Sequence, residues 1–151
     1  MPPDFSKLST AEKELAYKAP LLVCILIAGA DGKIDGKEMS EAIGMAQERE
    51  WVKANLKNYF AEVSEDFEDK IKMLIQAYPF EAAQRNPIIT NELSGLNQLW
   101  LKLDPDFSSA LYQSLRYISQ RIALSSGGFL KKISAEEAQL MDLPMLVDPG
   151  K

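Results

Sequence analysis

The amino-acid sequence predicts an all-α fold, a compact bundle of about seven or eight helices. Apolar residues recur at helical spacing along most of the chain, and no segment keeps the polar–apolar alternation of a half-buried strand. Patterns typical of helix N-termini precede several of these segments. With 151 residues, 46% of them hydrophobic, the chain is expected to form one domain over residues 1–151 around a continuous core.

The first two helices are expected between residues 9 and 30. Ser9-Thr10-Ala11-Glu12 matches a capping box, in which the serine hydroxyl and the glutamate carboxylate each accept a backbone N–H. Pro20 suits the first turn of the next helix, because the N–H that proline lacks would find no acceptor there. Residues 21–30 are apolar on every side, but about ten residues are half of what a bilayer span requires. We therefore predict a central helix that is surrounded by the rest of the chain, with Cys24 buried in it.

Four apolar stripes predict the helices that surround this centre. Each stripe has the three- and four-residue spacing of one helical face, and core packing is its expected role. The stripes consist of Val52, Leu56, Tyr59 and Val63; Phe67, Ile71, Leu74, Ile75 and Tyr78; Ile89, Leu93, Leu96, Trp100 and Leu103; and Leu111, Leu115, Ile118 and Ile122.

Further signals predict where helices begin. Asp35-Gly36-Lys37-Glu38 and Ser134-Ala135-Glu136-Glu137 match capping boxes, and Asp104-Pro105 places an N-cap before a proline at the first helical position. Ser64-Glu65-Asp66 is expected to open another helix. The acids at positions 65–69 lie at the positive end of its dipole, so this patch is expected to be a solvated helix start.

The C-terminal tail, residues 141–151, follows the last capped helix without helical periodicity. Five of the seven residues from 141 to 147 are apolar, and such a segment free in water favours aggregation or binding. We expect the tail to dock on its own domain as a strap. The alternative is a peptide that seeks a groove on a partner or on a second protomer.

Two segments, about 20–48 and 111–141, resemble each other. In both, an apolar helix ends near a glycine, and an isoleucine then precedes an N-cap with a glutamate three residues on. Asp31-Gly32 corresponds to Ser126-Gly127, Ile34-Asp35 to Ile133-Ser134, and Glu38 to Glu137, with four extra residues in the second copy. This order predicts an internal duplication with two pseudo-symmetric halves. The helices at 21–30 and 111–124 should then lie side by side at the centre, the second partly exposed because it carries polar residues.

The run from Ala28 to Glu38, Ala-Gly-Ala-Asp-Gly-Lys-Ile-Asp-Gly-Lys-Glu, resembles the hallmark of the TerB-like family, which is named for the tellurite-resistance protein. Members carry an apolar helix that ends in Ala-Asp-Gly, an aliphatic residue two places on, and a glutamate at the start of the next helix. The resemblance implies a compact helical fold of two related halves, an acidic site that chelates a divalent metal, and a role in bacterial stress or metal response. Ser126 departs from the family's pattern, because an aspartate is expected there.

Candidate metal ligands gather in and around this run. Asp31, Asp35, Glu38 and Glu41 lie within eleven residues, and Glu137 of the second copy could add a carboxylate. Their oxygens favour Ca²⁺, Mg²⁺ or Mn²⁺ over Zn²⁺. The loop is not an EF-hand, because lysine and alanine stand where its third and twelfth positions need carboxylates. In the alternative interpretation, Asp35 and Glu38 only cap a helix, and Asp31 accepts hydrogen bonds from turn N–H groups.

Composition excludes several classes of function. The sequence has no histidine and one cysteine, which excludes Ser-His and Cys-His nucleophiles, histidine-containing zinc sites and an intramolecular disulfide. The net charge is −5, and lysines and arginines do not cluster beyond pairs, so nucleic acid is not an expected partner. No signal peptide or membrane span is evident, and a cytoplasmic location is expected.

We expect a non-enzymatic, cytoplasmic helical domain that acts as a divalent-metal-linked stress-response or adaptor module and binds a protein partner. A homodimer also fits this expectation. One alternative is a plain protein-interaction module without metal. Another is a hydrolase whose metal is held by carboxylates, which would need a pocket lined by Asp31, Glu38 and Glu137 with an open coordination position.

Overall fold

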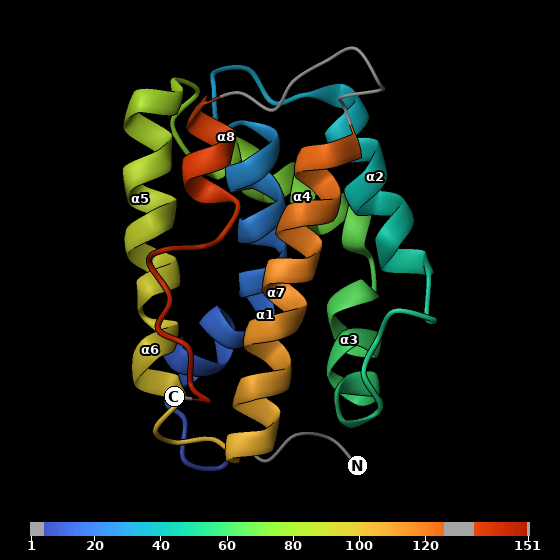
Figure 1. Cartoon of the computed structure of the whole chain (residues 1–151), viewed down its shortest axis with the longest axis vertical. Coiled ribbons are helices and arrows are strands. Elements are labelled where there is room, and N and C mark those ends of the chain that lie inside the picture. Colours follow the sequence, from blue (N-terminus) through green and yellow to red (C-terminus); the bar gives the residue numbers. More distant parts are fainter. Residues whose placement is uncertain (1–4, 126–134, 151) are drawn as a thin grey trace.

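The computed structural model describes residues 5–125 and 135–150, and within these ranges every regular element is a helix. The prediction of an all-α bundle is therefore confirmed. Eight α-helices and one 3-10 helix follow one another in the described ranges (Figure 1): α1, Thr10–Ala28; α2, Gly36–Gln47; η1, Ala54–Leu56; α3, Lys57–Ser64; α4, Phe67–Ala77; α5, Ala82–Ser94; α6, Leu96–Leu99; α7, Pro105–Ser125; and α8, Ala135–Leu140.

The C-terminal half of α1 is the centre of the bundle. Every residue from 21 to 30 is buried, and Leu22, Ile25 and Leu26 are fully enclosed. α7 packs along α1, and α2, α3 and α5 also contact it (Figure 1). Cys24 is buried here as predicted, and burial raises the pKa of its thiol to about 12. No helix within the described ranges, α1 included, is long and apolar enough to cross a membrane.

The prediction that a new helix starts at Pro20 is wrong. α1 runs without interruption through Pro20, which lacks the N–H that would bond the carbonyl of Ala16. The hydroxyl of Tyr59, on α3, donates to that carbonyl at 2.5 Å. This buried hydrogen bond replaces the one that the proline removes, so the helix continues. Burial also raises the pKa of Tyr59 well above its usual value of 10.

The apolar stripe at positions 89–103 is buried, but it belongs to two helices and not to one. α5 ends at Ser94 and α6 begins at Leu96, with Gly95 between them. A β-carbon at Gly95 would lie 2.9 Å from a methyl group of Leu15 on α1. A β-carbon there would also lie 3.1 Å from the carbonyl oxygen of Glu92, so the absence of a side chain at Gly95 suits the close approach of α1 to the junction.

The stripe at positions 52–63 is not one helix either, because Val52 precedes η1, Leu56 ends η1, and the other two residues belong to α3. In all three stripes other than 89–103, every side chain still packs in or against the core.

The capping signals at Ser9 and Asp104 are confirmed. At Asp35 only half of the predicted capping box is present, because the N–H of Asp35 donates to the carbonyl of Ala28 and not to Glu38. The hydroxyl of Ser9 accepts the N–H of Glu12 at 3.1 Å, and the carboxylate of Glu12 accepts the N–H of Ser9 at 2.8 Å. Asp104 accepts a backbone N–H from the first turn of α7 at 3.1 Å. α4 opens after Asp66 as predicted, although Asp66 has a left-handed φ of 53° and makes no side-chain capping bond. Ser134 lies outside the described residues.

The two segments predicted to be duplicated contain corresponding pairs of helices. α1 is followed by α2, and α7 is followed by α8. α1 and α7 pack side by side as predicted, and α7 is partly exposed, with Tyr117 at 42% and Leu124 at 62%. The second connection, with Ser126 and Ser134, lies outside the described residues. The two-fold relation of the halves therefore stays a prediction.

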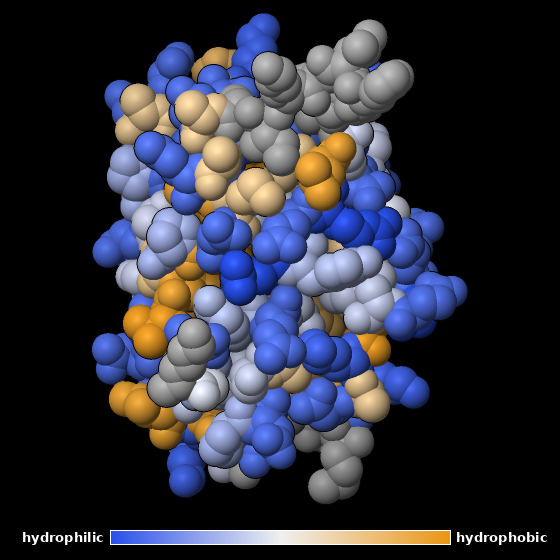
Figure 2. Space-filling model, in the orientation of Figure 1, coloured by the Kyte–Doolittle hydropathy of each residue, from blue (hydrophilic) through white to orange (hydrophobic). Residues whose placement is uncertain are grey.

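The C-terminal tail docks on its own chain, which confirms the predicted strap. Leu143 and Leu146 are buried. Asn97 of α6 donates to the carbonyl of Met145 at 3.0 Å and accepts the N–H of Val147 at 2.8 Å. Two more side chains of the bundle donate to strap carbonyls at 2.9 and 2.6 Å. The strap runs across part of the face shown in Figure 1. On the surface of this face, hydrophilic residues predominate and separate several apolar patches (Figure 2).

Candidate functional site

Four of the five predicted ligands lie in the acidic turn, residues 29–41, which runs from the end of α1 into α2. Arg85 of α5 is buried against this turn. Its guanidinium donates to the carbonyls of Gly29 at 2.6 Å and Gly32 at 2.8 Å. The neighbouring Asn86 donates to the carbonyl of Ala30 at 3.0 Å. α5 therefore holds the backbone of the turn in place.

Glycine is required at two places in the acidic turn. A β-carbon at Gly29 would collide with the guanidinium of Arg85, and Gly32 has a φ of +145°. Burial lowers the pKa of Arg85, and no carboxylate of the described residues lies within ion-pair distance of it. Backbone carbonyls therefore solvate this guanidinium. Arg85 therefore explains part of the Ala-Gly-Ala-Asp-Gly sequence. Gly29 leaves room for the guanidinium, and the carbonyls of Gly29 and Gly32 accept its hydrogen bonds.

Asp35 caps α2. Its Oδ1 accepts the N–H of Lys37 at 2.8 Å and the N–H of Glu38 at 3.0 Å. Its own N–H donates to the carbonyl of Ala28, at the end of α1, at 2.8 Å. These bonds are the ones that the capping alternative predicts for Asp35, and they tie the start of α2 to the end of α1.

Glu41 takes part in an ion pair. Arg121 of α7 donates through Nε to the carboxylate of Glu41 at 2.8 Å, and through Nη1 and Nη2 to that of Glu48 at 3.0 and 3.1 Å. The hydrogen bonds lower the pKa of Glu48 and raise that of Arg121. Glu41 therefore helps to join α2 to α7, with a cation of the chain itself beside it.

The other three predicted ligands have different surroundings. Asp31 is exposed, whereas Glu38 and Glu137, in the first turns of α2 and α8, are 1% and 3% exposed. Among residues 5–125 and 135–150, no three carboxylate or thiol groups gather in a way that would hold a metal ion. The five acids are thus divided among a cap, an ion pair, an exposed turn and two buried positions, and the metal site stays a prediction.

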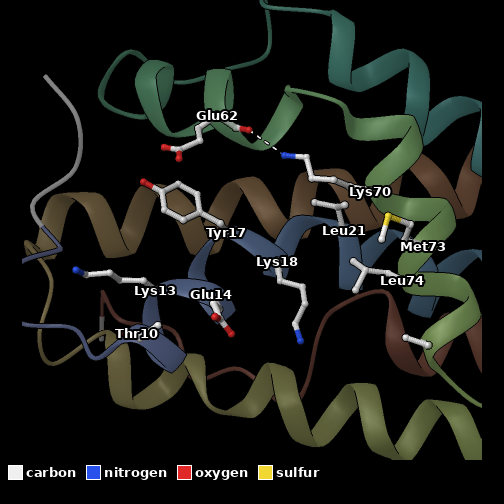
Figure 3. Close-up of a pocket in the computed structure, with 11 residues that line it drawn as sticks. Thr10, Lys13, Glu14, Tyr17, Lys18, Leu21, Glu62, Lys70, Met73 and Leu74 are labelled. Carbon is white, nitrogen blue, oxygen red and sulfur yellow. Dashed lines mark hydrogen bonds between the residues drawn. The ribbon is translucent and has the colours of Figure 1, made fainter.

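A groove that the sequence analysis missed lies between α1 and α4 (Figure 3). Its volume is about 650 Å³. On α1 and on α4 the lining residues recur every three or four positions, so each helix presents one face to the groove. The lining consists of Thr10, Lys13, Glu14, Tyr17, Lys18, Leu21, Glu62, Lys70, Met73, Leu74 and Ala77.

The surface of the groove is mostly apolar. Tyr17 and Leu21 contribute from α1, and Met73 and Leu74 from α4 (Figure 3). Ala77 of α4 also lines the groove. Met73 is 72% exposed. Apolar surface in contact with water is stabilised when another apolar surface covers it, so this groove is suited to association.

Charged side chains surround the apolar surface. Lys18 pairs with Glu92 of α5 at 2.8 Å. Lys70 donates through Nζ to the backbone carbonyl of Glu62 at 3.2 Å (Figure 3). Burial and a hydrogen bond with the Glu62 side chain raise the pKa of Tyr17 to about 12, so its hydroxyl stays protonated at neutral pH.

The sequence carries a weak signal for this groove. Met73 lies off the apolar stripe that predicts α4, and Tyr17 and Leu21 share a helical face with Lys13 and Glu14. Each of these positions alone is compatible with a solvated helix surface. Only the approach of α4 to α1 makes them one surface.

The two candidate sites differ in what their side chains can still bind. Asp35 and Glu41 use their carboxylates within the chain, whereas Met73 and the apolar surface around it face solvent.

No protein-family model matches the sequence, and no curated protein or solved structure matches the chain. Function is therefore inferred from the geometry of the described residues.

Proposed function

We propose that this chain is a non-catalytic helical adaptor domain of the TerB-like type, and that it binds an amphipathic helix of another polypeptide in the groove between α1 and α4. The groove itself carries the proposal: two helices present adjacent faces, and apolar side chains between them face solvent. Recognition of a helix in a groove uses this arrangement, with apolar anchors of the bound helix at i, i+3, i+4 and i+7.

The side chains of the groove suit such a ligand. Met73 is exposed at its edge, and an unbranched thioether can adapt its shape to different apolar partners. Tyr17 supplies an aromatic ring whose hydroxyl end lies toward Glu62 (Figure 3). The volume of about 650 Å³ gives room for several apolar side chains of a partner.

Methionine-methyl NMR tests the proposal. The protein, labelled with ¹³C at its methionine methyls, is titrated with a synthetic peptide of about five helical turns that carries leucine at the anchor positions of a groove-binding helix and alternating glutamate and lysine elsewhere. We expect the methyl of Met73 to shift and those of Met45 and Met141, which do not line the groove, to stay unchanged. An unchanged Met73 signal at millimolar peptide would contradict the proposal.

Two controls show whether the shift reports the groove. A peptide of the same composition, with its leucines scattered around the helix, should leave every methyl unchanged. Ala77→Arg places a long cation on the exposed wall of the groove and should abolish the shift. Leu101→Arg, at a position 84% exposed and outside the groove, should leave it intact. Equal effects of the two variants would mean that the peptide binds elsewhere.

A divalent-cation role is a second proposal, because Asp31 is exposed on a turn that Arg85 and Asn86 hold in place. Oxygen donors there favour Ca²⁺, Mg²⁺ or Mn²⁺, with a weak dissociation constant of about 0.1–1 mM. A cation at about 100 times that constant should stabilise the fold by about 2.7 kcal/mol. The melting temperature would rise by about 5–11 °C.

The metal role has a direct test. Melting is compared in chelator and in each cation, for the wild type and for Asp31→Asn. The rise should occur in the wild type and disappear in the variant. Equal melting temperatures of the wild type in chelator and in every cation would contradict a metal site at the acidic turn, and would leave the proposed adaptor role as it stands.

A further inference from the structure

The charges around the groove point to its occupant. We infer that the groove binds a second copy of this chain, so that two protomers associate through their α1–α4 faces. This inference rests on the proposed function, because it names the polypeptide that covers the groove.

Four charges at the groove have no ion-pair partner in the part of the chain that the structure describes. They are two lysines, Lys13 and Lys70, and two glutamates, Glu14 and Glu62. A two-fold axis places such a patch against itself, so each lysine can pair with a glutamate of the other protomer. A partner helix with a uniformly acidic or basic polar face would instead repel two of the four charges. The balanced set therefore favours a second copy.

The charge of the whole chain also favours contact at this face. The net charge is −5, so two copies repel each other over much of their surfaces. The groove is lined by three lysines and two glutamates, a net charge of +1. Electrostatic repulsion between two copies is therefore small where their grooves meet.

The shape of this face is self-complementary as well. Met73 is 72% exposed and lies beside the hollow formed with Tyr17 and Leu21. A projecting apolar side chain and an apolar hollow on the same face satisfy what a two-fold interface requires, because each protomer supplies both. In such a dimer, Met73 of one protomer enters the groove of the other.

Sedimentation velocity of the full chain tests the inference, over about 10–500 µM protein so that weak dimers are populated. We expect a species of twice 16.9 kDa whose fraction rises with concentration. Met73→Glu and Ala77→Arg should leave only the monomer. Leu101→Glu, at an exposed position outside the groove, should dimerise like the wild type. A wild type that stays monomeric throughout, or a Met73→Glu variant that dimerises unchanged, overturns the inference.

A charge-reversal pair tests the self-complementarity. One variant carries Lys13→Glu and Lys70→Glu, and the other carries Glu14→Lys and Glu62→Lys. Each should be folded by circular dichroism and monomeric alone, because like charges then face each other. A mixture should give the heterodimer by native mass spectrometry, less of it at high salt. Unchanged dimers of either variant alone, or a mixture that stays monomeric, would show that these charges do not direct association.

Failure of the dimer and failure of the proposed function give different results. A monomeric wild type whose Met73 methyl still shifts with the synthetic peptide overturns the dimer and retains the binding groove. A monomeric wild type without that shift contradicts both. If the dimer forms, excess peptide should compete for the groove and restore the 16.9 kDa species.

Discussion

The acidic turn follows the C-terminal end of α1, whereas the groove is lined by the N-terminal half of α1 together with α3 and α4. The two regions differ in how their polar groups are satisfied. In the turn, Asp35 caps α2, Glu41 pairs with Arg121, and Arg85 donates to backbone carbonyls. At the groove, four charges make no ion pair within the described ranges, and Met73 is exposed. The segment whose sequence suggests chemistry is largely structural, whereas the surface available for binding has no sequence motif.

Substitutions in the two regions should therefore affect different properties, the free energy of unfolding in one case and binding in the other. Changes in the core and the acidic turn should lower the free energy of unfolding and leave binding in the groove unchanged. Changes on the groove should abolish binding and leave the free energy of unfolding within about 0.5 kcal/mol of the wild type.

The largest effect on the free energy of unfolding is expected in the buried half of α1, which adjoins both regions. Leu26 is fully enclosed in the centre of α1. Leu26→Ala should lower the free energy of unfolding by about 2–5 kcal/mol, through lost apolar burial and the cavity that remains. Urea unfolding at neutral pH measures the change. A loss below about 1 kcal/mol would mean that this part of α1 is not the core.

Arg85→Met should have a comparable effect, because the carbonyls of Gly29, Gly32 and Phe80 each lose a donor. An unsatisfied buried acceptor costs about 1–3 kcal/mol. Arg116→Met is the matched control, since its ion pair with Asp142 is exposed, and its effect should stay within about 0.5 kcal/mol. Similar losses for both variants in urea unfolding would show that Arg85 does not hold the turn.

Tyr59→Phe removes the donor that serves the carbonyl of Ala16 beside Pro20. The expected loss at neutral pH is about 1–3 kcal/mol. The pKa of Tyr59 is raised in the folded state, so its contribution is complete below pH 10 and is lost as the pH rises above 10. Urea unfolding between pH 8 and 11 should therefore show a steeper alkaline loss in the wild type than in Tyr59→Phe. Parallel curves would contradict this role.

The smallest effect on stability distinguishes two neighbouring aspartates. Asp35→Ala should cost about 1 kcal/mol, because two N–H groups at the start of α2 lose their acceptor. Asp31 is exposed, and Asp31→Ala should change the free energy of unfolding by less than about 0.5 kcal/mol in the absence of metal. The same loss at both positions would argue against a purely capping role for Asp35.

Local patterns predict the local structure well. The capping box at Ser9 depends on residues three positions apart, and the structure confirms it. The apolar stripes predict which side chains pack in or against the core, although the stripes at 52–63 and 89–103 are each divided between elements. The effect of Pro20 could not be predicted, because its compensating hydrogen bond joins Tyr59 to a residue 43 positions away. The same reason applies to Glu41, whose cation, Arg121, is 80 positions away.

The sequence also cannot distinguish a metal-ligating carboxylate from a carboxylate that caps a helix N-terminus. Asp35 has the spacing of both, and only the two N–H groups within hydrogen-bond distance show which role it has in this chain. The groove is harder still to predict. Its lining comes from α1, α3 and α4, and no pattern within one helix reports the distance between two helices.

The measurement that tests this account most directly compares one variant from each region. Binding of the fluorescently labelled amphipathic peptide is followed by anisotropy, and unfolding by urea, for Asp35→Ala and Ala77→Arg. We expect Asp35→Ala to bind the peptide like the wild type although it is about 1 kcal/mol less stable. We expect Ala77→Arg to be as stable as the wild type, within about 0.5 kcal/mol, and not to bind. Loss of binding in Asp35→Ala with retention in Ala77→Arg would contradict the account, because the acidic turn would then be the binding site.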